Sequence, residues 1–261
     1  MNWIEAMILG IVQGLTEFLP VSSSGHLEIG KVLLNVEFKE DLTFTVLVHL
    51  ATVFSTITVF FTEIKELAKG VFAFRWNTET QYVVQILVSM IPVLTVGLLF
   101  REEIESLFSG NLYLVGGALL VTSLLLISTQ LSKTGTKKIA YLDAFVMGIA
   151  QAAAVVPGIS RSGATISVGL LLRNNRSDVA RFSFLMVLLP IIGAAVLDIV
   201  SISSRSGEQG IRAGALLVGF FSAYVSGFLA CRWMISLVKK GNLYWFALYC
   251  ALVGIISIVF A

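Results

Sequence analysis

The chain has 261 residues, of which 57% are hydrophobic and 13% are charged, about half the roughly 25% charged content of ordinary soluble domains. The mean hydropathy is +0.91, which excludes a water-soluble globule and a disordered chain. The net charge of +2 gives no reason to expect nucleic acid as a partner. Cys231 and Cys250 lie in apolar stretches, so we expect them to pack between helices and not to form a disulfide framework.

The elements, in chain order, alternate between broken and continuous apolar segments. Residues 1–34 and 142–172 each contain two apolar halves separated by a break rich in Pro, Gly and Ser. We predict that each forms a re-entrant helical hairpin, because exposed backbone is tolerated in a bilayer only where protein or water surrounds it. The six continuous segments are long enough to span, and they are 42–62, 82–100, 112–131, 180–200, 211–232 and 242–260. The predicted fold is an all-α integral membrane protein with six transmembrane helices and two hairpins.

The two broken segments are related by an internal repeat. The same residue recurs 138 positions later at several places, including Gly10 and Gly148, Gln13 and Gln151. A single membrane domain, 1–261, would then consist of repeat one, about 1–131, and repeat two, about 142–261. Three spanning helices follow each hairpin, so the second copy is expected to be inverted. Inverted repeats with broken helices place a site near the bilayer midplane, between the copies.

Basic residues predict the orientation. With the termini on one side, most Lys and Arg residues fall on the other, among them Lys65, Lys69, Lys138 and Lys239. Because loops rich in Lys and Arg stay inside, both termini and the mouth of the first hairpin are expected to be extracytoplasmic. The start of the chain, MNWIE, lacks the basic region of a cleavable signal peptide.

The break of the first hairpin is polar where lipid would be expected. Gln13 and Glu17 share a helix face, and Pro20 is followed by Ser22, Ser23, Ser24, Gly25 and His26. One interpretation is structural: the serines cap the second half-helix, Gly25 makes a tight turn and Glu17 pairs with a cation. The other is functional, since ionisable groups inside membrane segments are costly and mark sites.

The break of the second hairpin contains an arginine. Arg161 lies between Ser160 and Ser162, and Gly163 and Thr165 follow in the next half-helix. Arg161 either pairs with Glu17 as a structural ion pair or binds an anion. Two half-helix N-termini that meet beside an arginine form an anion trap, and a bidentate arginine suits phosphate.

A phosphate held there would lie beside groups that phosphoryl transfer needs. A serine hydroxyl can attack, His26 can move a proton, and Glu17 can act as a base or hold a divalent metal. The spacing leaves open whether a serine, His26 or a water positioned by Glu17 attacks. His49, in a spanning segment, is expected to be a packing histidine. A site in the bilayer favours a substrate with an apolar tail and a phosphorylated head.

Two motifs resemble those of a known family. The runs LGIVQGLTEFLPVSSSGH, residues 9–26, and PGISRSGAT, residues 157–165, resemble those of the undecaprenyl-diphosphatases, the bacitracin-resistance type of bacterial membrane phosphatase. The resemblance covers the whole chain in length and helix pattern. It implies hydrolysis of undecaprenyl diphosphate to undecaprenyl phosphate and phosphate in the bacterial plasma membrane, which recycles the lipid carrier for peptidoglycan and lowers bacitracin sensitivity.

The resemblance also implies roles for individual residues. Ser23 becomes the preferred nucleophile, His26 its acid/base partner, Glu17 the base or metal ligand and Arg161 the phosphate clamp. The neighbouring polar and small residues would contact the substrate, and they are Gln13, Ser22, Ser24, Gly25, Ser160, Ser162, Gly163 and Thr165.

Position 13 departs from the two-carboxylate form of the family motif. Gln13 cannot act as a base and is a weaker metal ligand than Glu, so the Mg²⁺ or Ca²⁺ that the resemblance implies is expected to be bridged to the diphosphate. The competing function is a transporter or flippase for a lipid phosphate, because inverted repeats with broken helices are common in transporters. The sequence leaves open whether the chain forms a homodimer.

Overall fold

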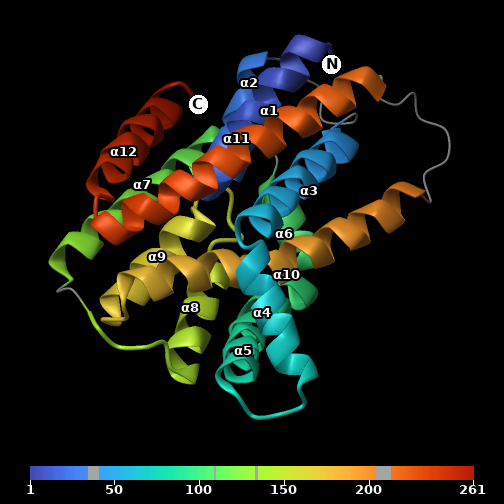
Figure 1. Ribbon diagram of the computed structural model, residues 1–261. Coiled ribbons are helices and arrows are strands. Elements are labelled where there is room, and N and C mark those ends of the chain that lie inside the picture. The colour runs from blue at the N-terminus through green and yellow to red at the C-terminus, as the bar shows by residue number, and fades with distance from the viewer. Residues whose placement is uncertain (35–40, 109, 133–134, 204–212) are drawn as a thin grey trace.

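The computed structural model describes residues 1–34, 41–108, 110–132, 135–203 and 213–261. Within these ranges the chain is all-helical and has no β-strand beyond two isolated bridges, which confirms the predicted class (Figure 1). The helices are α1 Trp3–Phe18, α2 Ser23–Leu34, α3 Asp41–Val59, α4 Phe61–Phe72, α5 Thr78–Leu99, α6 Arg101–Leu107, α7 Leu112–Leu131, α8 Tyr141–Ala153, α9 Arg161–Leu171, α10 Arg176–Ser203, α11 Ala213–Lys240 and α12 Tyr244–Val259.

Both broken segments form a helix, a break and a second helix. In the first, α1 begins at an Asn2 capping box and ends at Phe18, just before Pro20. Proline cannot donate a backbone hydrogen bond and disfavours helix at the residue before it, so the chain turns there and α2 begins at Ser23. In the second, α8 ends at Ala153 and α9 begins after Pro157 and Gly158.

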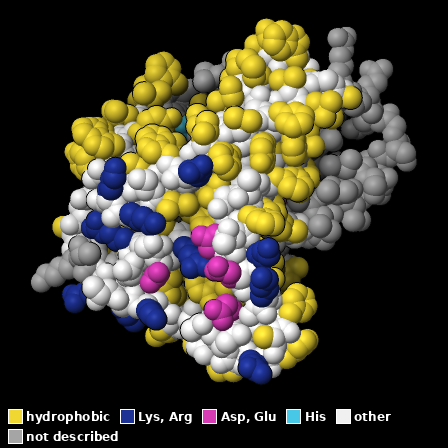
Figure 2. Space-filling view, viewed as in Figure 1, with side chains coloured by type: hydrophobic (Ala, Val, Ile, Leu, Met, Phe, Trp, Pro, Cys, Tyr) yellow, Lys and Arg dark blue, Asp and Glu magenta, His cyan; other side chains and the backbone are white. Residues whose placement is uncertain are grey.

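Several helices present apolar surface suited to lipid. Three helices of the described ranges, α5, α7 and α11, are long and apolar enough to cross a membrane. The predicted span 42–62 differs from the structure, because α3 ends at Val59 and the chain bends by 76° into α4. Figure 2 shows that hydrophobic side chains dominate the upper part of one face and that charged side chains lie across its middle and lower parts. This distribution fits a membrane protein with a charged end.

Glycines let helices from different parts of the chain approach closely. A Cβ added at Gly10 of α1 would collide with the carbonyl oxygen of Gly219 on α11, and one at Gly148 of α8 would collide with that of Ser89 on α5. Small residues at helix contacts are typical of membrane bundles. The first helix of each hairpin therefore packs against a spanning helix from the other half of the chain, α1 on α11 and α8 on α5.

The same spacing recurs where α7 packs on α12. Gly116 and Gly254 are 138 positions apart and face each other, since a Cβ on Gly116 would lie 2.6 Å from Gly254 O and one on Gly254 would lie 2.8 Å from Gly116 O. Cys231 and Cys250 are buried and free, as expected. The pairing of helices leaves the two hairpin breaks facing each other inside the bundle.

Candidate active site

The two hairpin breaks touch each other. A Cβ added at Gly25 would lie 3.0 Å from the Cα of Gly158, so a larger residue at position 25 would push the breaks apart. The backbone N–H of Gly158 donates to Ser22 Oγ at 3.2 Å, and Ser162 Oγ donates to the carbonyl oxygen of Leu19 at 3.3 Å. Residues about 138 positions apart are thus joined directly at the centre of the molecule.

Two serines cap the half-helices that begin at the breaks. Ser22 has a φ of 69°, a left-handed conformation that is costly for a residue with a Cβ. Its Oγ accepts from the N–H of Gly25 at 3.2 Å as well as from Gly158. Ser160 Oγ accepts from the N–H of Gly163 at 3.0 Å at the start of α9. The structural interpretation of the serines therefore applies to Ser22 and Ser160.

Glu17 lies at the centre of the site and contacts both hairpins. Ser23 Oγ donates to Glu17 Oε2 at 2.5 Å, and Gln13 Nε2 donates to the same oxygen at 3.0 Å. Arg161 Nη2 donates to Glu17 Oε1 at 2.7 Å, forming an ion pair in which the Glu17 side chain is 7% exposed. Ser23 differs from the capping serines because its hydroxyl is bonded to a carboxylate.

A small cavity opens over these groups, with an empty space of about 200 Å³ including its opening to solvent. Ser23 is the first residue of α2 and Arg161 the first of α9, so the N-terminal ends of both half-helices lie beside it. Their unpaired N–H groups and the guanidinium favour an anion. Its wall is formed by Thr16, Glu17, Ser22, Ser23, Ser24, Ile159, Ser160 and Arg161.

Sequence comparison agrees with the two motifs at this site. The family model of the bacitracin resistance protein BacA matches residues 6–256. The chain belongs to the BacA family. A protein of Bacteroides fragilis named undecaprenyl-diphosphatase is 52% identical over 99% of this chain and 98% of the relative. Relatives of the same name from Christiangramia forsetii and Carboxydothermus hydrogenoformans are 49% and 39% identical, over 100% and 99% of this chain and 99% and 97% of their own lengths.

The resemblance predicted from the motifs is confirmed by this match over nearly the full chain. Membership of the BacA family, together with the apolar helices, makes the chain a multi-pass membrane protein.

His26 is oriented away from the Glu17 cluster, by which we mean Glu17 and the three residues bonded to it, Gln13, Ser23 and Arg161. In the described part of the chain its ring nitrogens bond elsewhere: Nδ1 lies 2.8 Å from the carbonyl oxygen of Ser22, and Nε2 lies 2.7 Å from the hydroxyl of Tyr249 on α12. The two rings are stacked with centroids 5.5 Å apart. Because a carbonyl only accepts, Nδ1 carries a proton, and in the neutral ring Nε2 accepts from Tyr249.

His49 is expected from the sequence to be a packing histidine with no role in the site. Its Nε2 lies 3.9 Å from Glu17 Oε2, while Nδ1 donates to the carbonyl oxygen of Thr45 at 2.8 Å. The histidine is therefore a neighbour of the cluster on α3 and not a packing residue remote from it. The available signal was its position inside an apolar span, where ionisable groups are expected to be functional.

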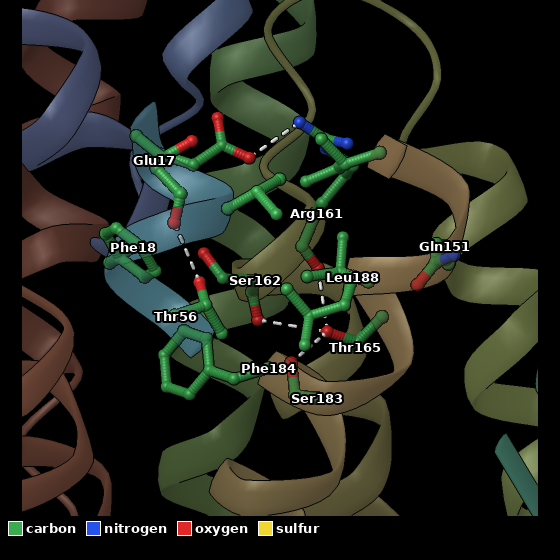
Figure 3. A pocket seen from close by; sticks show the side chains of 14 residues that line it. Glu17, Phe18, Thr56, Gln151, Arg161, Ser162, Thr165, Ser183, Phe184 and Leu188 are labelled. Carbon is green, nitrogen blue, oxygen red and sulfur yellow. Dashed lines mark hydrogen bonds and ion pairs between the residues drawn. The ribbon is translucent and has the colours of Figure 1, made fainter. Parts of the chain in front are cut away.

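The polar residues of α9 extend the site away from the Ser23 side. Thr165 Oγ1 donates to the carbonyl oxygen of Arg161 at 2.8 Å and lies 2.6 Å from Ser183 Oγ on α10. Thr165 and Ser183 line a second cavity, and Glu17 and Arg161 line it as well (Figure 3). The ion pair between Glu17 and Arg161 thus lies between two cavities.

The donor set fits a metal brought by the substrate better than one caged by protein. Among the residues that the structure describes, no group of three His, Cys, Asp or Glu side chains could hold an ion. Glu17 supplies one carboxylate, and Gln13 Oε1 is buried without a hydrogen-bond partner. One carboxylate and one amide oxygen, completed by phosphate oxygens and water, suit Mg²⁺.

Proposed function

We propose that this chain hydrolyses undecaprenyl diphosphate to undecaprenyl phosphate and inorganic phosphate at the outer face of the bacterial plasma membrane. The reaction would recycle the lipid carrier for peptidoglycan synthesis and confer bacitracin resistance. The observation that carries the proposal is the 2.5 Å hydrogen bond from Ser23 to Glu17, beside an arginine at two half-helix N-termini. Full-length identity of 52% to a protein named undecaprenyl-diphosphatase supports it.

The contacts favour Ser23 as the nucleophile. Its hydroxyl donates to Glu17 Oε2, so the carboxylate can take the proton as Oγ attacks the terminal phosphorus. The bond from phosphorus to the bridging oxygen breaks, and undecaprenyl phosphate leaves with the proton returned from Glu17. Water then attacks the phosphoserine and gives a proton to Glu17. The bond from phosphorus to Ser23 Oγ breaks, Oγ takes that proton from Glu17, and phosphate is released.

Arg161 and the helix ends would stabilise the charge that develops on phosphorus oxygens. Arg161 can turn from Glu17 to the phosphoryl oxygens, because phosphate is also a bidentate acceptor for guanidinium. The unpaired N–H groups at the starts of α2 and α9 would add donors fixed in place before the substrate arrives. Fixed donors of this kind usually make the largest contribution to catalysis.

A divalent cation, when bound, would neutralise charge on the diphosphate. Glu17 and Gln13 are the residues that would hold it on the protein side. The buried, unpartnered Gln13 Oε1 supports this assignment, and the remaining ligands would be phosphate oxygens and water.

For the membrane arrangement we propose six spanning helices and two re-entrant hairpins in an inverted repeat. The paired contacts of α1 with α11 and α8 with α5 support it, as does the facing pair Gly116 and Gly254. Both termini would lie outside, since most loop lysines and arginines fall on the opposite side.

The test is phosphate release from undecaprenyl diphosphate by the detergent-purified protein, with wild type and Glu17→Gln compared. Glu17→Gln keeps the size of the side chain but removes the base, so release is expected to fall by about 10²- to 10⁴-fold. A chelator added to wild type measures the dependence on a cation. Folded wild type that releases no phosphate with magnesium present would overturn the proposal and leave lipid-phosphate transport as the function to test.

A further inference from the structure

A second cavity lies behind the ion pair of Glu17 and Arg161, between α1, α3, α8, α9 and α10. Its empty space is about 420 Å³ including its opening to solvent. Figure 3 shows Gln151 of α8 and the Glu17–Arg161 pair among the side chains around it. No part of the mechanism above uses this cavity.

Gln151 is the unusual residue of the cavity wall. It is 1% exposed, and neither its Oε1 nor its Nε2 has a hydrogen-bond partner. Buried amides almost always have partners, and an unpaired one is costly. Its repeat counterpart, Gln13, donates to Glu17 four residues later, but position 155 holds Val155 instead of a carboxylate. The second hairpin therefore keeps the amide and lacks the group that would bond it.

The hydroxyl groups of the wall are already bonded within the protein. Thr52 donates to the carbonyl oxygen of His49 at 2.7 Å, and Thr56 donates to that of Thr52 at 3.0 Å. Thr165 and Ser162 also donate to backbone carbonyls, and Ser183 is hydrogen-bonded to Thr165.

Among the described residues of this cavity wall, two side chains have N–H groups that donate no hydrogen bond within the protein. They are both N–H groups of Gln151 Nε2 and the N–H groups of Arg161 that do not reach Glu17. Because some of these free donors belong to a charged guanidinium, the wall suits an anion with several acceptor oxygens. The free Oε1 of Gln151 can in addition accept from a phosphate oxygen that carries a proton.

We propose that this cavity is a second phosphate subsite, in which Gln151 and Arg161 bind the phosphate of a reaction product. The proposal rests on the proposed function, since Arg161 would pass between the two cavities as it releases Glu17. The ligand chemistry is a phosphate monoanion or dianion, supplied either by inorganic phosphate or by the head of undecaprenyl phosphate.

The experiment measures thermal stabilisation of the purified wild-type protein by inorganic phosphate and, separately, by undecaprenyl phosphate, because a ligand that binds the folded state raises its stability. Gln151→Met replaces the amide with an apolar chain of similar length. The affinity for at least one ligand is expected to fall about tenfold or more, as for a lost hydrogen bond to a charged ligand. Stability without ligand is expected to stay equal or rise.

A second variant and a matched control separate binding from folding. Gln151→Leu has a different shape but also lacks the amide, so it is expected to weaken phosphate binding as Gln151→Met does. Gln85→Met removes an amide that donates to the carbonyl oxygen of Ile139 at 2.9 Å, outside this cavity. It is expected to lower stability and leave phosphate affinity unchanged.

The outcomes are distinct. Weaker binding of inorganic phosphate assigns the subsite to the released phosphate, and weaker binding of undecaprenyl phosphate alone assigns it to the lipid head. Unchanged affinity for both ligands in the Gln151 variants overturns the proposal. So does a loss of ligand-free stability that matches Gln85→Met, since Gln151 would then have a structural partner. Because these measurements need no turnover, they remain readable if phosphate release fails.

Discussion

The two hairpins share a scaffold. Gly10 and Gly148 stand at equivalent positions, and each allows its helix to pack closely on a spanning helix of the other half. Ser22 and Ser160 are also equivalent, and each caps the half-helix that follows its break. What the hairpins have in common therefore builds the frame: close helix contacts and two half-helix N-termini that meet.

The hairpins differ at the positions that can do chemistry. Glu17 in the first corresponds to Val155 in the second, and Ser23 corresponds to Arg161. One hairpin thus carries the hydroxyl and the carboxylate, while the other carries the cation that pairs with that carboxylate. The comparison teaches that the residues the hairpins share build the contacts between them, and that the residues that differ carry the groups on which the proposed reaction depends.

The largest expected effect on phosphate release comes from replacing Ser23, whose counterpart in the second hairpin is Arg161. Ser23→Ala is expected to lower phosphate release about 10³-fold or more, because it removes the attacking hydroxyl. Glu17 keeps its ion pair with Arg161, so the free energy of unfolding should change little. Phosphate release and thermal unfolding in detergent check both statements. Retained release would show that Ser23 is not the attacking group and would leave His26 or a water positioned by Glu17 in that role.

The ion pair that joins the hairpins is expected to affect stability. Arg161→Met leaves the buried carboxylate of Glu17 without its cation, and the loss is expected to be about 3 kcal/mol or less, since Arg161 is 30% exposed. The double variant Glu17→Gln/Arg161→Met removes both charges and should recover most of that loss. Thermal unfolding of the three proteins gives the coupling. Additive losses would mean that the pair contributes no coupling to stability.

The sequence predicted the helices and breaks around this site better than the hydrogen bonds and ion pairs within it. The two breaks and the apolar helices depend on local composition and spacing, so they could be predicted directly from the sequence. The bond from Ser23 to Glu17 and the ion pair to Arg161 link residues that composition alone only suggested as partners. The orientation of His26 could not be read from spacing, because its partner Tyr249 is 223 positions away.

The bend after α3 and the place of His49 have similar explanations. A window of apolar residues predicts that a helix spans, but not that Phe60 ends it and that α4 turns by 76°. His49 is brought to Glu17 by the packing of α3, which a single sequence does not encode in any short pattern. Tertiary contacts therefore decided these features.

The shared frame predicts equal sensitivity of the two hairpins to a methyl group. Gly10→Ala and Gly148→Ala would each push a Cβ into a backbone carbonyl of the neighbouring helix. Both are expected to lower the free energy of unfolding by about 1–3 kcal/mol. Gly97→Ala is the control, because a Cβ there meets nothing within 4 Å, and it should be neutral or slightly stabilising. A loss at only one of Gly10 and Gly148 would break the equivalence.

The smallest expected effect concerns His26, whose counterpart in the second hairpin is Ala164. Tyr249→Phe removes the hydroxyl that bonds His26 Nε2 at 2.7 Å but keeps the stacked ring. The family resemblance implies that His26 is the acid/base partner in the reaction, and one neutral hydrogen bond contributes about 1 kcal/mol. Phosphate release should therefore fall about two- to tenfold, with little change in unfolding. Tyr244→Phe, half-exposed at the start of the same helix, is the matched control and should be neutral. A loss of 100-fold or more would mean that Tyr249 does more than orient the ring and that the first hairpin depends on α12 for its chemistry.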